Sequence, residues 1–258
     1  MKKLKQIPSE LQNLKTPVEK LYYKGDISLL KKPKVAIVGS RRPISYTKNI
    51  TYELSKKLSN AGICIVSGAA MGVDALAHQG AGSHNTIAVM GNGLKHRYPK
   101  VNKNLIEKIE QNGLVLSMFE PDFIATPWSF VVRNEIIVAL SQAVVITQAD
   151  LKSGSMRSAE FALKHNKPIY VLPHRLNESK GTNRLLKEGL ATAIYDMDEF
   201  AKTFDTTSEK KEIKVDEFYE FCKNFPRYED ALKLFGDRVF EEELEGNIVV
   251  QNGTIRLA

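Results

Sequence analysis

The chain has 258 residues, of which 43% are hydrophobic and 26% charged, so a folded protein is expected and extensive disorder is excluded. Its formal net charge is +7. Residues 206–258 hold 8 Lys and Arg against 12 Asp and Glu, which leaves 29 basic and 18 acidic residues in 1–205. The first part therefore carries +11 and the second −4, and the basic part fits a polyanionic partner such as nucleic acid.

Several functional classes find no support in the sequence. No apolar stretch reaches the ~18 residues of a membrane-spanning helix. Cys64 and Cys222 stand far apart, without the spacing of a disulfide framework or a zinc site. The five histidines lack metal-ligand spacing, and there is no Walker-type phosphate loop. We expect a cytoplasmic protein with no membrane insertion, no metal, no cofactor and no catalytic residue.

Residues 1–33 are interpreted as an N-terminal segment packed on the main domain, with a short helix at 9–14 and a strand at 20–23. From residue 34 to 205, apolar β-branched runs alternate with helical periodicities, which predicts a parallel sheet. The expected strands are 34–38, 63–67, 86–90, 114–117, 143–146, 168–172 and 192–195. The expected helices are 47–61, 73–81, 101–111, 130–140, 156–164 and 181–189. The fold class predicted is α/β, an extended Rossmann fold with a parallel-rich, doubly wound sheet.

Residues 206–214 are charged and lack apolar periodicity, so they are interpreted as a linker. Residues 215–258 then predict a small winged-helix-like module. Its expected elements are helices at 215–222, 228–235 and 237–245, followed by a hairpin that turns at Asn252-Gly253. Because this module is acidic, contact with the phosphates of DNA is unfavourable for it.

Three expected strands end in polar, glycine-containing turns that could bind an anion. Gly39, Ser40 and Arg41 follow the first strand, where backbone N–H groups and a guanidinium could hold a phosphate. The same residues could equally turn the chain and expose a solvated arginine. The motif alone favours neither interpretation.

The other two turns carry similar alternatives. Ser67 and Gly68 begin a run of small residues that could admit a ligand or merely allow a helix to pack closely, and Asp74 could orient a cation. Lys152, Ser153, Gly154 and Ser155 resemble a nest of N–H groups and hydroxyls at a helix start. Simple N-capping explains the serines, but it does not require Lys152, so the functional interpretation is favoured there.

The segment around residues 128–135 places aromatic side chains beside Arg133 and Asn134. Aromatic faces and cations together suit single-stranded nucleic acid, whose bases stack on them. An ordinary amphipathic helix is the alternative, and for Phe130 a place in the core is the favoured interpretation.

Taken in order, several motifs resemble those of the DprA/Smf family of bacterial DNA-processing proteins. They are VAIVGSR, IVSGAAMGVDALAH, GNGLKHRYP, FVVRNEIIVALS, SGSMRSAEFAL, PIYVLP and GTNRLLKEG, between about residues 17 and 200. Three positions depart from the family pattern, namely Glu135, Gln148 and His174. Glu135 brings a negative charge to a motif that usually continues with arginine.

The resemblance implies a homodimeric single-stranded DNA-binding protein that acts in natural transformation and helps to load the recombinase RecA. It also implies where DNA would bind, with Arg41 as the main contacting cation. The implied DNA-binding residues are Gly39, Ser40, Arg41, Ser67, Gly68, Phe130, Arg133, Asn134, Lys152, Ser153, Gly154 and Ser155.

An enzymatic alternative is a nucleotide phosphoribohydrolase similar to the LOG family, which shares this Rossmann variant. Such enzymes carry a PGGxGTxxE loop whose glutamate acts on the ribosyl bond. Here the corresponding stretch is DLKSGSMRSAE, so the glycine pair and threonine are missing, although Glu160 is roughly in register.

Overall fold

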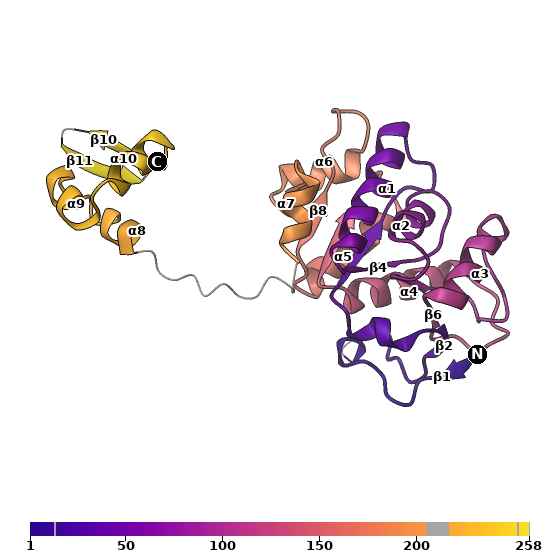
Figure 1. Ribbon diagram of the computed structural model, residues 1–258. Coiled ribbons are helices and arrows are strands. Elements are labelled where there is room, and N and C mark those ends of the chain that lie inside the picture. Colours follow the sequence, from indigo (N-terminus) through magenta and orange to yellow (C-terminus); the bar gives the residue numbers. More distant parts are fainter. Residues whose placement is uncertain (13, 205–216, 252, 258) are drawn as a thin grey trace. The chain divides into compact units, whose positions relative to one another are not determined.

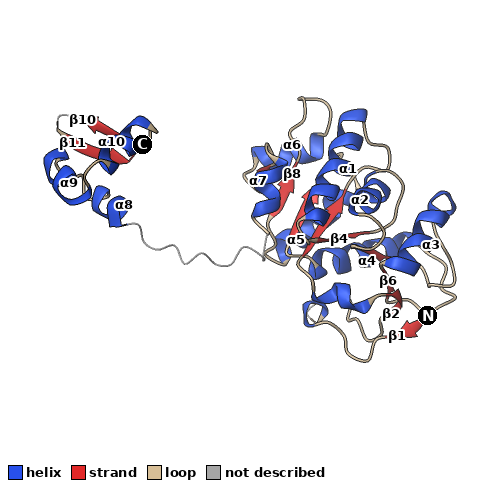
Figure 2. Cartoon of the chain, in the orientation of Figure 1, coloured by secondary structure: helices blue, strands red, loops and turns tan. Residues whose placement is uncertain are grey.

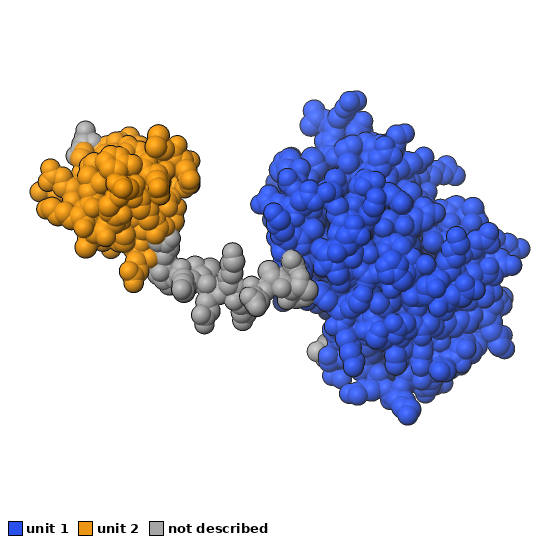
Figure 3. Space-filling model, viewed as in Figure 1, with its two compact units in different colours: residues 1–206 blue, residues 207–258 orange. Residues whose placement is uncertain are grey.

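A computed structural model describes residues 1–12, 14–204, 217–251 and 253–257. The chain divides into two compact units, residues 1–206 and 207–258 (Figure 3). The linker expected at 206–214 lies outside the described residues, as does Asn252 of the expected hairpin turn. The predicted domain boundaries therefore remain predictions.

Unit 1 is built on one sheet in which nine strands follow the order β1-β2-β6-β5-β4-β3-β7-β8-β9. In this order, the seven adjacent strands from β6 to β9 are parallel to one another. Strand β2 runs antiparallel to β6, and β1 runs antiparallel to β2. Figure 2 shows the strands with helices around them. The strands are β1 (Lys2–Lys3), β2 (Tyr22–Gly25), β3 (Lys34–Val38), β4 (Cys64–Ser67), β5 (Thr86–Val89), β6 (Leu114–Ser117), β7 (Ala143–Ile146), β8 (Ile169–Val171) and β9 (Thr192–Ala193).

Helices cover both faces of this sheet because alternate residues of the buried strands point to opposite sides. Ala36 and Val38 of β3 belong to one core with α4 (Pro127–Leu140), α5 (Gly154–Lys164) and part of the N-terminal segment. Val35 and Ile37 belong to the other core, with α1 (Ser45–Asn60), α2 (Val73–Ala81) and α7 (Met197–Lys202). In Figure 1, α1 and α2 lie side by side. The remaining helices of unit 1 are α3 (Lys103–Asn112), α6 (Lys180–Lys187) and the 3₁₀ turns at Ser9–Leu11, Ile27–Lys31 and Lys100–Asn102.

The strand order reverses between β3 and β7. The chain leaves β3 toward β4, β5 and β6 on one side, and β7 continues the sheet on the other side of β3. In doubly wound sheets, ligands bind at the carboxyl ends of the strands next to such a switch point, since the connections there diverge and leave a crevice. The topology therefore places two segments of this chain at the candidate site, namely Gly39 to Arg41 and the residues after Ile146.

The fold class predicted from the sequence is confirmed, and most elements lie within two or three residues of their expected positions. The predicted helix 73–81 and strand 143–146 match the observed bounds. The predicted helix 101–111 is wrong at its start, because its first residues form a 3₁₀ turn. The sequence analysis missed β1 and α7; α7 has six residues and its start is capped by the Asp196 side chain, which accepts bonds from two backbone N–H groups.

Unit 2 contains three short helices and an antiparallel hairpin, the elements expected for this part of the chain. They are α8 (Glu217–Cys222), α9 (Tyr228–Phe235), α10 (Arg238–Leu244), β10 (Ile248–Gln251) and β11 (Thr254–Leu257). Its core consists of six buried side chains, those of Phe218, Cys222, Ala231, Val239, Ile248 and Ile255. No helix among the described residues is long and apolar enough to cross a membrane.

Candidate functional site

An open groove of about 600 Å³ lies at the switch point, between the end of β3 and the first turns of α4 and α5. Gly39, Ser40 and Arg41 form one side of it. Of the other predicted residues, the groove brings together Phe130, Arg133, Asn134, Ser153, Gly154 and Ser155. Nine of the twelve predicted residues thus line one groove, although they come from three separate segments of the sequence.

Arg41 is an exposed cation that lines this groove and forms no ion pair among the described residues. Its guanidinium carbon lies 5.9 Å from the centre of the Phe130 ring, close enough for a cation–π contact. Phe130 is half-buried and faces the groove, so the favoured prediction that it belongs to the core is wrong. Its ring lies 5.8 Å from that of Tyr98, which is 49% exposed. Arg41, Phe130 and Tyr98 all line a small hollow that adjoins the groove, and together they offer a charge and two aromatic rings there.

The backbone at Gly39 and Ser40 differs from the predicted phosphate rim. The N–H of Ser40 donates to the carbonyl of Gln148 at 2.8 Å, and the N–H of Arg42 donates to the Ser40 hydroxyl at 3.1 Å. These two N–H groups are therefore engaged within the protein. Gly39 is required by packing, because a Cβ there would lie 2.8 Å from a methyl group of Val73. The turn thus positions Arg41 and supplies no N–H of Ser40 to an anion.

Arg133 is buried beneath the groove, where the sequence predicted a DNA contact. Its side chain is 4% exposed, and its Nη1 donates to the carbonyl of Gly68 and, at 2.9 Å, to that of Val89. The carboxylate of Asp74 accepts the N–H groups of Gly68 and Ala70 from the same turn. Burial raises the pKa of Asp74, and the charge of Arg133 opposes that rise. Arg133 therefore holds the ends of β4 and β5 together, with little surface left for a ligand.

Ser67 does not line the groove, which corrects the prediction for this residue. It is fully buried, and its hydroxyl donates to the carbonyl of Ile37 at 2.6 Å. Gly68 borders a small adjoining hollow and lies against the guanidinium of Arg133, which leaves no room for a side chain. The small residues after β4 thus serve close packing, the structural alternative that the sequence left open.

His78 fixes the turn after β4 from below. It is fully buried, and its Nε2 accepts the N–H of Ala69, a residue with a positive φ of 53°. Its Nδ1 lies 2.6 Å from the hydroxyl oxygen of Thr86, which itself donates to the carbonyl of Ile65. Nδ1 is therefore the donor, and the imidazole is neutral. Burial lowers the pKa of His78 to about 3.

This histidine should make unfolding pH-dependent. Below its ordinary pKa of about 6.5 the unfolded chain takes up a proton that the folded protein excludes, so stability falls as the pH falls toward about 3. Between pH 7 and pH 5 the expected loss is about 2 kcal/mol. Urea unfolding of the wild type and of His78→Gln at both pH values measures this loss of stability. The raised pKa of Asp74 changes stability in the opposite direction, but it does so in both proteins, so the difference between them reports on His78. An equal pH dependence in the two proteins would contradict this assignment.

The start of α5 forms the opposite wall. Ser153 is the N-cap residue, but its side chain caps no backbone group, and its buried hydroxyl has no partner. Gly154 is exposed with open space around it. Lys152 is exposed and does not line the groove, so the predicted point charge is misplaced. Arg157, one turn into the helix, lines it instead. The sequence analysis missed Arg157, although its spacing of three residues from Gly154 puts both on the same side of the helix.

The departures from the family pattern have structural roles away from the ligand surface. Glu135 is buried, does not line the groove, and accepts bonds from Lys164 and His165, each at 3.1 Å. The Gln148 side chain accepts the N–H of Ile44. His174 lies 2.7 Å from the carbonyl of Thr147, to which its Nε2 donates. The negative charge that Glu135 brings to the motif therefore lies outside the groove lining.

Glu160, the residue that the enzymatic alternative requires, does not line the groove. Its carboxylate pairs with Arg157 at 2.7 Å on the exposed surface of α5. Among the described residues there is also no group of three or more His, Cys, Asp or Glu side chains that could hold a metal ion.

The fold and the groove define a Rossmann-type α/β protein whose candidate site is an open groove lined by arginines, an aromatic ring and hydroxyl groups. Residues 1–205 match the family described as DNA recombination-mediator protein A, and the chain belongs to this family. The resemblance drawn from the sequence motifs is thereby confirmed.

Curated relatives include the DNA processing protein DprA of Bacillus subtilis, 35% identical over 196 residues, and that of Streptococcus pneumoniae, 38% identical over 173 residues. These matches cover 74% and 66% of the chain, and 66% and 61% of the relatives. The chain thus spans less than two thirds of the length of these relatives.

Solved structures similar to this chain include two DNA processing proteins. DNA processing protein A of Helicobacter pylori is 48% identical with a TM-score of 0.77, over 78% of this chain and 94% of that one. DprA of S. pneumoniae is 34% identical with a TM-score of 0.71, over 77% of this chain and 71% of that one.

Proposed function

We propose that the groove of unit 1 binds single-stranded DNA and that the protein makes or breaks no covalent bond in doing so. The observation that carries the proposal is the exposed Arg41 over the Phe130 ring, at the edge of the groove. The similar H. pylori protein is described by its single-stranded DNA binding mode, which supports the same ligand class here.

The chemistry of binding follows from the groove walls. Arg41 neutralises a phosphate and releases its counterions, which makes affinity dependent on salt. A base then stacks on Phe130 and Tyr98, a contact that does not depend on sequence. The open start of α5, where Gly154 is exposed, receives a second phosphate, since a helix N-terminus favours negative charge. Single strands are favoured because a paired duplex cannot turn its bases into a groove.

The wider role follows from the family. A recombination mediator that holds single strands would protect incoming DNA during natural transformation and pass it to the recombinase RecA. We propose this role, with a homodimer in the cytoplasm as the acting species. Light scattering of the full chain tests the dimer, and strand-exchange assays with RecA test the transfer.

Fluorescence anisotropy of a labelled poly-dT oligonucleotide at two salt concentrations tests the binding itself. We expect tight, salt-sensitive binding that neither an unlabelled matched duplex nor a nucleoside monophosphate displaces. Equal competition by the duplex would contradict the preference for single strands. Displacement by the mononucleotide would instead favour a small-molecule site.

A further inference from the structure

A second hollow, of about 460 Å³, lies on the α1 and α2 side of Arg41. Arg41 lines both this hollow and the groove, so the two depressions are neighbours at that residue. The other charged residues that line the hollow are Arg42 and Lys48. Gly72, Leu76 and Gln79, from the region of α2, also line it.

The charge of this hollow is of one sign. Arg41, Arg42 and Lys48 are all exposed, and among the described residues none of them forms an ion pair. No acidic residue lines the hollow. Arginines elsewhere in unit 1, such as Arg97, Arg157 and Arg184, pair with glutamates. Three unpaired cations around one depression repel one another, and an anionic ligand would relieve that repulsion.

The backbone holds these cations in place. The N–H of Val73, the first residue of α2, donates to the carbonyl of Ser40 at 3.1 Å. Gly72 has a φ of 76°, and a Cβ at this position would lie 2.6 Å from the carbonyl carbon of Arg41. Only glycine therefore lets the turn after β3 lie directly on the start of α2. This packing fixes the backbone of Arg41 and Arg42 at the edge of the hollow.

We infer that a DNA strand bound in the groove continues past Arg41 into this hollow, where Arg42 and Lys48 contact phosphates of the following nucleotides. The inference rests on the proposed function. It adds the path that the strand takes beyond the groove and a longer stretch of DNA in contact with the protein. It assigns Arg42 and Lys48 to a phosphate subsite that only a strand longer than the groove reaches.

The test compares two lengths of poly-dT on the full chain, one of about six nucleotides and one of about twenty, given site sizes of roughly 4–16 nucleotides in comparable modules. In the variant Arg42→Ala/Lys48→Ala, the long oligonucleotide should bind about tenfold more weakly, and its salt slope should fall by about 1.4 for two lost contacts. The short oligonucleotide should bind within about twofold of wild type, because it occupies the groove alone.

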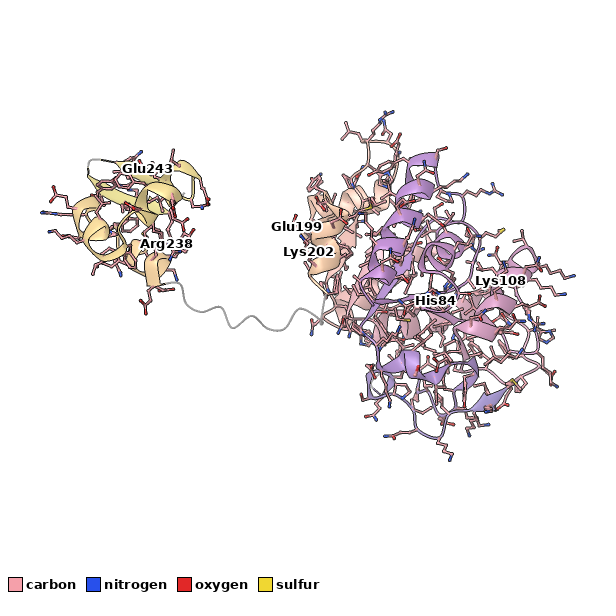
Figure 4. All side chains as sticks on the ribbon, in the orientation of Figure 1. His84, Lys108, Glu199, Lys202, Arg238 and Glu243 are labelled. Atoms are coloured by element: carbon pink, nitrogen blue, oxygen red, sulfur yellow. The ribbon has the colours of Figure 1, made fainter. Side chains whose placement is uncertain are left out.

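The matched control is Lys56→Ala/Lys108→Ala, which removes the same formal charge. Lys56 lies farther along α1, and Lys108, which is labelled in Figure 4, lies on α3. Both are exposed, and neither lines the groove or the hollow. This variant should bind both lengths within about twofold of wild type. Equal weakening of both lengths by Arg42→Ala/Lys48→Ala, no weakening of either, or the same loss in the control would overturn the subsite. Wild-type protein that binds neither length would instead overturn the proposed function.

Discussion

Replacing Arg133 with alanine should lower the free energy of unfolding by about 3–5 kcal/mol. The substitution removes two bonds to the carbonyls of Gly68 and Val89 and leaves the buried Asp74 carboxyl without the cation that opposes its desolvation. Leaving buried carbonyl groups without their charged hydrogen-bond donor costs more free energy than an exposed ion pair contributes. Urea denaturation followed by circular dichroism measures the change.

Arg157→Ala is the control, because Arg157 lines the same groove but pairs with Glu160 on the surface, where both side chains are 60% exposed. We expect its loss to change the free energy of unfolding by less than about 1 kcal/mol. If Arg133→Ala were as stable as this control but bound DNA poorly, Arg133 would be a ligand contact, as the sequence first suggested.

The sequence predicted the sheet well because each buried strand is a short apolar run with a polar turn after it. Ala143 to Ile146 is buried on both faces, and such continuous runs are typical of a parallel sheet. The topology then brought three turns to one edge, so the location of the candidate site could be predicted from the strand ends alone. The antiparallel strands β1 and β2 were harder, since their pairing depends on β6, far along the chain.

The orientation of single side chains could not be predicted in the same way. Arg133 lies on α4, where the sequence pattern does not show whether its side chain points toward the core or toward solvent. Its buried orientation depends on hydrogen bonds to two carbonyls at the ends of β4 and β5. Lys152 precedes the N-cap of α5, so it lies outside the helical face that Arg157 shares with Gly154. The N–H of Ser40 donates to the carbonyl of Gln148, which belongs to a distant segment of the chain. The errors at Arg133 and Ser40 come from tertiary contacts that no local pattern contains, whereas the error at Lys152 comes from its position before the start of the helix.

Arg41→Ala should weaken binding of single-stranded DNA by about 10- to 100-fold at low salt. Among the described residues, Arg41 alone lines both the groove and the second hollow, and its side chain is exposed. Its loss should therefore weaken the binding of short and long oligonucleotides alike. The salt slope should fall by about 0.7, the value for one phosphate contact on a single strand. Anisotropy titrations of poly-dT over a range of salt concentrations measure both quantities.

Arg41→Lys separates the two contributions of this side chain. Lysine keeps the charge, and with it the salt slope, but it lacks the planar group that stacks on the Phe130 ring and on bases. We therefore expect an intermediate affinity with a wild-type slope, whereas Lys108→Ala, remote from both depressions, should match wild type. Unchanged affinity in Arg41→Ala would contradict a role in binding. Arg41 would then be a solvated charge beside a turn, the alternative that the motif left open. Because stability should be unaffected by any change at this exposed position, a loss of binding would report on the ligand contact itself.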